Sequence, residues 1–165
     1  MAAPDIQLHV ATEAHARALA ARMRPADAAE VSSSLGVGAL EAVLASMAVS
    51  EVTWAAIFDG EVAGLFGVAR LQDAPGTLLG GPDVGVVWLL TSSAVDGNRR
   101  AFLRYSRAIL SALLQRYPIL VNAIDARHVA ALRWARWLGF TVSAAVPYGV
   151  EGLPFHPISI RSPHV

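Results

Sequence analysis

The stretch RHVAALRWARWLGF, Arg127 to Phe140, has the pattern of an amphipathic helix that leads into a β-strand. Gly139 predicts where this helix ends, because glycine readily adopts the left-handed conformation that closes a helix. The apolar run ILVNAID comes just before the stretch and predicts a buried strand. Residues 140–146 predict another strand. A helix between two strands indicates an α/β architecture.

The chain before this unit predicts further strands and helices. Two β-rich runs, 52–58 and 61–71, flank Asp59-Gly60, a strong signal for a two-residue hairpin. The run 84–91 is almost continuously apolar, which is typical of a central strand buried on both faces. The longest helix is expected over 98–117, where Pro118 ends it. The other expected elements are strands at 6–11 and 155–161 and helices at 12–23, 27–35 and about 40–47.

This order of elements predicts one α/β (α+β) domain over residues 1–165. We expect a mixed, twisted sheet of about six to seven strands flanked by helices. No internal repeat and no linker interrupts the pattern. A length of 165 residues suits one domain, and 55% apolar against 16% charged residues can bury a core.

The composition excludes several classes of function. The 13 basic and 13 acidic residues give a formal net charge of zero, so whole-molecule attraction to nucleic acid or to an anionic membrane is not implied. The absence of cysteine excludes disulfides and thiolate chemistry, and the histidines lack metal-ligand spacing. We find no signal peptide and no apolar run as long as a membrane span. We therefore expect a protein that is neither secreted nor membrane-bound.

The order of elements and three of its segments resemble the GNAT (GCN5-related N-acetyltransferase) superfamily over nearly the whole chain. VVWLLTSSAV matches the family's strand before its pyrophosphate-binding loop, and ILVNAID matches the next strand. HVAALRWARWLGF matches the helix pattern N-x-x-A-x-x-x-Y-x-x-x-G-F, with Ala131, Gly139 and Phe140 in agreement. The resemblance implies a GNAT-like domain and, in an active member, acyl transfer from acetyl-CoA.

The chain departs from the family at positions that would carry chemistry. His128 replaces the asparagine of the helix pattern, and Ala135 replaces the tyrosine that often protonates the departing thiolate. If Arg99 leads the pyrophosphate loop, Phe102 and Arg104 stand at two of its glycine positions. Side chains there would block the close approach of backbone N–H groups to phosphate. The strand VVWLLTSSAV also lacks the glutamate base that is common in the family.

A second resemblance covers roughly the C-terminal half of the chain. WLLTSSAV, the helix FLRYSRAILSALLQRYPILVN and the ending GLPFHPISI are similar to the internal virion protein A family of podophages, in which the glycine loop is also missing. This resemblance implies a role in virion assembly or in the internal core. It implies other phage virion or assembly proteins as partners, and the host cytoplasm or the virion as location.

The first hypothesis is a phage virion-associated or morphogenesis protein that uses a degenerate GNAT scaffold for protein contacts. It needs no cofactor and is not an enzyme, since the loop glycines, the tyrosine and the strand glutamate are all missing. Arg107, on the basic helix, and Trp137, at a position usually polar in GNAT proteins, are candidate partner-binding residues. A homo-oligomer is also compatible with the apolar composition.

The alternative hypothesis is an acetyl-CoA-dependent N-acetyltransferase with an atypical pyrophosphate loop. Thr91 and Ser92 would line the cleft beyond the central strand, and Arg99, Arg100 and Arg104 would hold the phosphates. Simpler interpretations remain open: the hydroxyls can form an ST-turn, and arginines at helical spacing can be a solvated face. DNA binding by the basic helix is a third hypothesis, which the zero net charge disfavours.

No catalytic residue is assigned from the sequence. Asp125 and His128 are close in the chain. Asp125 is expected to cap the following helix, or else to orient His128 as a base. Asp27, Glu30 and Glu51 are the acidic residues nearest the helices that cover the acceptor site in GNAT proteins, and none of them is an evident base.

Overall fold

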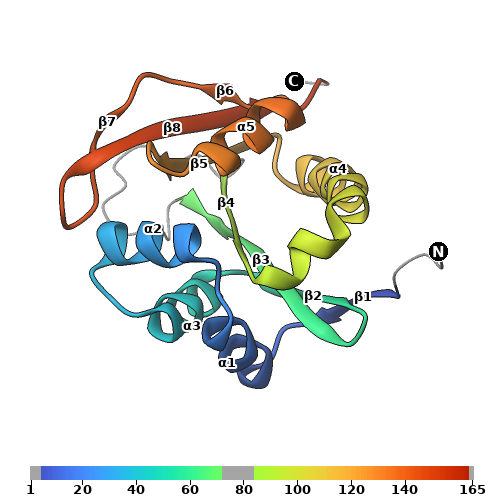
Figure 1. Ribbon diagram of the computed structural model, residues 1–165. Coiled ribbons are helices and arrows are strands. Elements are labelled where there is room, and N and C mark those ends of the chain that lie inside the picture. The colour runs from blue at the N-terminus through green and yellow to red at the C-terminus, as the bar shows by residue number, and fades with distance from the viewer. Residues whose placement is uncertain (1–4, 72–83, 164–165) are drawn as a thin grey trace.

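A computed structural model describes residues 5–71 and 84–163 as an open sheet with helices on both faces (Figure 1). The strands are β1 (Ile6–Val10), β2 (Val52–Phe58), β3 (Glu61–Arg70), β4 (Val84–Thr91), β5 (Ile119–Asp125), β6 (Thr141–Val142), β7 (Val146–Tyr148) and β8 (Leu153–Arg161). The helices are α1 (Glu13–Ala21), α2 (Pro25–Leu35), α3 (Ala39–Val49), α4 (Arg99–Arg116) and α5 (Val129–Leu138), with a short 3-10 helix, η2 (Ser93–Asn98), before α4. The expected α/β domain is confirmed, with eight strands in the sheet instead of six to seven.

The sheet is mixed and runs in the order β1-β2-β3-β4-β5-β8-β6, with β7 also paired to β8. Its paired strands are antiparallel except for β4 and β5, which are parallel and are connected through α4. The β2–β3 hairpin turns at Asp59 and Gly60, whose φ angles are 50° and 81°. Positive φ at both positions is what a type I′ turn requires, so the predicted hairpin is confirmed.

Each face of the sheet carries its own core. The helices α1, α2 and α3 cover one face, and α4 and α5 cover the other (Figure 1). The buried residues of the first core are Ala16, Leu19, Val31, Ala42, Val43, Ala55, Leu65 and Leu90. Those of the second are Val68, Leu110, Tyr117, Leu120, Ile124, Leu132, Ala135, Phe140 and Ile158. The central strands are thus buried on both sides, as their apolar runs predict.

Local residues set most helix boundaries. Pro25 stands in the first turn of α2, where its missing N–H costs no helical hydrogen bond. Gly36 closes α2 in the left-handed conformation at φ 72°, and Gly139 closes α5 in the same way at φ 100°. The end of the helix predicted from the opening stretch is therefore confirmed.

The strand expected at 140–146 is wrong in its extent. Only Thr141–Val142 and Val146–Tyr148 pair with β8, and the chain between them leaves the ladder. Val142 is opposite Ile158 and Val146 is opposite Phe155, so the two registers against β8 differ by one residue, as in a β-bulge. The loop expected at 72–83 lies outside the described residues. Among the described helices, none alone is long and apolar enough to cross a membrane, although α2 and α3, bent by 69°, pass that test as a pair.

β4 and β5 pair only over their first residues. Residues 84–86 face 119–121 in the parallel register, and beyond this point the described ladder joins neither strand to the other. β4 continues to Thr91 and β5 to Asp125. Asn122 Nδ2 donates to Val87 O at 2.7 Å where the two strands separate. The carboxyl ends of two central strands are therefore apart, which is the place where open α/β sheets bind ligands.

Candidate functional site

Polar side chains of α2 lie against the gap between β4 and β5. Asp27, Glu30 and Ser33 are spaced three residues apart, so they follow one side of the helix. Asp27 bonds to the end of β4, whereas Glu30 and Ser33 bond to Asp125 at the end of β5. A helix on the opposite face from α4 thus connects the two separated strands.

Asp27 is hydrogen-bonded through both of its carboxylate oxygens. It is 6% exposed, and its Oδ2 accepts hydrogen bonds from Thr91 N at 3.0 Å and from Thr91 Oγ1 at 2.6 Å. Its Oδ1 lies 2.8 Å from His128 Nε2. Both carboxylate oxygens are therefore satisfied, as a buried carboxylate requires.

His128 connects the site to α5. Its Nδ1 accepts a hydrogen bond from Ala131 N at 3.4 Å, so Nε2 carries the proton that it donates to Asp27. Burial acts to lower the pKa of His128, but the hydrogen bond to Asp27 and the charges of Asp27 and Glu30 outweigh it and raise that pKa. Full protonation would turn Nδ1 into a donor and break the cap of α5.

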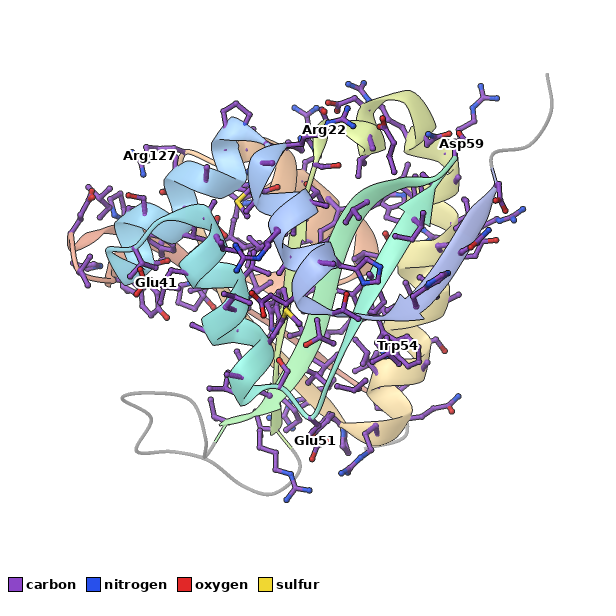
Figure 2. The ribbon with its side chains drawn as sticks, turned by 90° about the horizontal axis from the view of Figure 1, so that it is seen from below. Arg22, Glu41, Glu51, Trp54, Asp59 and Arg127 are labelled. Carbon is purple, nitrogen blue, oxygen red and sulfur yellow. The ribbon has the colours of Figure 1, made fainter. Side chains whose placement is uncertain are left out.

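Asp125 belongs to a different cluster, at the end of β5. Its Oδ1 accepts from Arg127 N at 2.8 Å, the Arg127 guanidinium binds both of its oxygens, and Ser33 Oγ donates to it. The hydrogen bonds from Arg127 hold the pKa of Asp125 below its ordinary value. Figure 2 shows Arg127 beside α2. The expectation that Asp125 caps α5 or orients His128 is wrong: His128 is the cap, and its partner is Asp27.

Glu30 is the group best placed for proton transfer. Its Oε2 accepts from Asp125 N at 2.9 Å, and the side chain is partly buried. Burial raises the pKa of Glu30 to about 7, against the lowering effects of the Asp125 N–H and of His128. A carboxyl group with a pKa near neutrality can accept and release a proton at physiological pH.

A cavity of about 130 Å³ opens from this gap toward α4 and α5. Asp27, Glu30, Thr91 and His128 line its polar end. The rest of the wall is largely apolar and includes Phe66, Leu89, Ile109, Leu113, Trp134 and Leu138. A titratable carboxyl at the end of a mostly apolar cavity is the usual composition of a small-molecule site.

Aromatic contacts join the two helices that wall the cavity. The rings of Phe102 on α4 and Trp134 on α5 are 5.6 Å apart between centroids. The Arg107 guanidinium lies 4.0 Å from the centroid of the Trp137 ring. Trp134 Nε1 is buried and has no hydrogen-bond partner among the described residues.

The sequence matches no protein-family model and no curated protein. Solved structures match it over almost its whole length. The aminoglycoside acetyltransferase AAC(6')-Ib, in complex with coenzyme A, matches with a TM-score of 0.71 at 16% identity over 95% of each chain. A ribosomal-protein-alanine N-acetyltransferase from Brucella melitensis matches with a TM-score of 0.65 at 17% identity, over 94% of this chain and 99% of that one. An acetyltransferase of the GNAT family from Streptococcus pneumoniae matches with a TM-score of 0.59 at 15% identity, over 96% of this chain and 100% of that one.

The fold is that of the GNAT acetyltransferases. Identities this low show the GNAT fold and leave activity and substrate open. The resemblance in fold that the sequence indicates is therefore confirmed. The resemblance to podophage internal virion proteins finds no support among these matches and stays a prediction.

Within the GNAT fold, the two predicted hydroxyl residues have different places. Thr91 lines the cavity, with its hydroxyl donated to Asp27. Ser92 is outside the cavity wall, because its hydroxyl donates to Val62 O at 2.6 Å and accepts from Ala94 N at 3.2 Å. Ser92 therefore caps η2, and the turn interpretation describes it better than the cleft interpretation.

The predicted phosphate-binding arginines lie at the start of α4. Arg99, Arg100 and Arg104 are exposed in the first two turns of α4. Arg99 is 3.9 Å from Asp96, and Arg100 forms no ion pair with any described residue. Arg107 lies on Trp137 instead, so these two candidate partner-binding residues form one exposed pair.

Glu51 lies away from the candidate site. It pairs with Arg70 at 2.7 Å and with Arg116 at 3.3 Å. Arg70 is opposite Gly85 near the start of β4, so this cluster is at the other end of that strand from Thr91. Figure 2 shows Glu51 and Asp59 at opposite ends of the β2–β3 hairpin.

The sequence contains one signal that could have identified Glu30. In the helix PADAAEVSSSL, the two acidic residues and the middle serine recur every three positions, at 27, 30 and 33. A buried stripe of this kind needs polar partners. The described residues contain no group of three or more His, Asp or Glu side chains placed to hold a metal ion.

Proposed function

We propose that the protein is an acetyl-CoA-dependent N-acyltransferase that acts in the gap between β4 and β5, with Glu30 as general base. The observation that carries this proposal is a carboxyl with a pKa of about 7 at the polar end of a cavity where the central strands separate. Its support from known proteins is the shared fold with AAC(6')-Ib, which was solved with coenzyme A.

The chemistry needs one proton acceptor beside an amine and a thioester. The coenzyme supplies the acyl group as a thioester. The Glu30 carboxylate accepts a proton from the amine while the amine nitrogen forms a bond to the carbonyl carbon of the thioester. The carbon–sulfur bond breaks, and protonated Glu30 returns the proton to the departing thiolate. Glu30 therefore also acts as the proton donor to the thiolate, a role that Ala135 cannot fill because its side chain has no proton to donate.

Asp27 and His128 are positioning residues in this scheme. Asp27 fixes Thr91 at the end of β4 and His128 at the start of α5. Both of those residues line the cavity next to Glu30. The negative charge of Asp27 raises the pKa of Glu30, whereas a positive charge on His128 lowers it.

The two ends of coenzyme A fit the protein in different ways. The thioester end suits the gap, which has the Glu30 carboxyl and an adjoining apolar wall. If Arg99 leads the pyrophosphate loop, as the GNAT resemblance implies, Phe102 and Arg104 stand at two of its glycine positions, and the phosphate end has no glycine loop. Exposed Arg100 and Arg104 offer guanidinium groups instead, which bind phosphates through paired hydrogen bonds.

Calorimetric titration with acetyl-CoA tests the binding step. We expect micromolar binding that Arg100→Ala/Arg104→Ala weakens by at least about tenfold, because a hydrogen bond to a charged group contributes about 1.5–3 kcal/mol. Arg17→Ala/Arg161→Ala also removes two exposed charges, from α1 and β8, and is the matched control. A folded protein that shows no binding at millimolar acetyl-CoA would exclude the proposal.

Replacement of the base tests the chemical step. Glu30→Gln should retain acetyl-CoA binding and lose about 100-fold or more in the rate of transfer to an amine, which is the usual contribution of a general base. The readout is free thiol released from acetyl-CoA in the presence of a panel of amines. An unchanged rate would show that another group accepts the proton.

A second proposal is the phage role implied by the sequence: virion assembly through protein contacts. It is supported by the departures at Phe102 and Ala135 and by Trp137, which is 40% exposed with Arg107 stacked on its ring. Its test is detection of the chain in purified procapsids and virions, followed by Trp137→Ala. Absence from both particles, together with acetyl-CoA binding, would exclude it.

A further inference from the structure

We propose that the cavity beneath α4 is an acyl-chain pocket, which makes the protein selective for thioesters of acyl groups longer than acetyl. This inference rests on the function proposed above and names its donor class. The expected donor carries about five or six carbon atoms in an unbranched acyl chain.

The cavity continues well beyond the polar end where the chemistry is placed. Its wall follows β4 from Thr91 back through Leu89 to Val87, and it reaches Leu113 and Leu138 near the ends of α4 and α5. Four residue steps along a strand span roughly 13 Å. An acyl chain whose carbonyl carbon lies near Glu30 can therefore extend along a continuous apolar wall.

Small residues of the sheet and a sparsely buried helix surround this space. Of the 18 residues in α4, only Leu110 is buried. The sheet beneath α4 contributes Ala56, Ala63 and Gly64 to the cavity wall. Protein interiors are normally packed with few voids larger than a water molecule, so this much unfilled apolar space points to an occupant.

The volume indicates the size of the occupant. A dry cavity of about 150 Å³ lined by Leu, Ile and Phe holds one benzene molecule, and the cavity here measures about 130 Å³. The single methyl group of an acetyl donor would leave most of it empty. An acyl chain of about five or six carbons matches it.

Trp134 indicates that the occupant also carries a polar atom. This side chain lines the cavity, and its Nε1–H is buried without a partner among the described residues. Buried donors are nearly always hydrogen-bonded. A thioester or amide carbonyl on the acyl carrier can accept this hydrogen bond, whereas a plain hydrocarbon cannot.

Titration with a chain-length series tests the inference on the wild-type protein. The ligands are acetyl-CoA, hexanoyl-CoA and free hexanoate. Hexanoyl-CoA has four more methylene groups than acetyl-CoA, and each buried methylene is equivalent to about fourfold in affinity. Allowing for incomplete burial, we expect hexanoyl-CoA to bind at least about tenfold more tightly than acetyl-CoA, and free hexanoate to bind far more weakly.

Two variants test whether the preference for hexanoyl-CoA depends on this cavity. Leu113→Phe and Ile109→Phe, made separately, add bulk at two places in the cavity wall, so each should reduce the hexanoyl-to-acetyl affinity ratio by about tenfold. The matched control is Leu35→Phe, the same change at an exposed position on α2, which should leave the ratio unchanged. The wild-type series does not depend on whether either variant folds.

The outcomes separate the two proposals. Equal binding of acetyl-CoA and hexanoyl-CoA would overturn the acyl-chain pocket and leave the acyltransferase proposal in place. No binding of either thioester would overturn both. Free hexanoate bound as tightly as hexanoyl-CoA would show an aliphatic site unrelated to an acyl donor, and would also overturn the inference.

Discussion

Glu30→Gln is expected to stabilise the protein at pH 8 more than at pH 5, although it removes the proposed base. Glutamine keeps the shape of the side chain and an acceptor for Asp125 N–H, but it cannot ionise. Burial raises the pKa of Glu30 from 4.5 to about 7 in the folded protein. Between pH 4.5 and about pH 7, the folded state holds a proton that the unfolded chain has already released. The free energy of unfolding of the wild type therefore falls as the pH rises from 4.5 to about 7, and it does not change further above that range.

The size of the effect follows from the pKa difference. Each pKa unit corresponds to about 1.36 kcal/mol, so ionising Glu30 costs the folded state at most about 3 kcal/mol above pH 7. About 2 kcal/mol of this loss develops between pH 5 and pH 8, and partial exposure of the side chain reduces it further. For a chain of this length, 2 kcal/mol corresponds to about 4–8 °C in Tm.

Thermal unfolding followed by circular dichroism measures the effect at the two pH values. The Tm of Glu30→Gln minus that of wild type should be larger at pH 8 by several degrees. Glu41→Gln is the matched control, because Glu41 is an exposed glutamate at the start of α3 (Figure 2). A Tm difference that is the same at both pH values would refute the raised pKa and remove Glu30 as a base that is half-protonated near pH 7.

Asp27→Ala should lower the free energy of unfolding by about 3 kcal/mol, because two donors of Thr91 lose their acceptor; urea unfolding measures this, and a loss under about 1 kcal/mol would contradict it. Gly85→Ala should cost about 1–3 kcal/mol in the same assay, since the new Cβ would lie 2.9 Å from Tyr117 Cγ. Trp134→Phe removes the unpaired N–H, so it should weaken hexanoyl-CoA binding by about fivefold without lowering Tm; unchanged affinity would show that Nε1 does not contact the ligand.

Local chemistry in the sequence was sufficient to predict most elements. The Asp59-Gly60 turn and the helix-closing Gly139 act within a few residues, and the apolar periods of strands and helices are equally local. The strand expected at 140–146 is divided because its pairing depends on β8, against which β6 and β7 differ in register by one residue. That information is distant in the chain from the strand it affects.

The spacing of residues in the sequence did not predict which side chains are hydrogen-bonded to one another in the site. The proximity of Asp125 to His128 in the chain suggested that they interact, but the Asp125 carboxylate is hydrogen-bonded to Arg127. The partner of His128 is Asp27, which is 101 positions away. α2 brings Asp27 into place from the other face of the sheet, so only packing between distant elements could identify this pair.

The sequence by itself determined the class of fold and the order of its elements, because these depend on residue identity and short-range spacing. It also shows that the loop glycines and the tyrosine expected from the GNAT resemblance are absent. The tertiary structure alone decided that Glu30 faces a cavity with a pKa of about 7. A pKa depends on how far a group is removed from water and on the charges around it. For Glu30 both are set by the separation of β4 from β5 and by the packing of α2 against that gap.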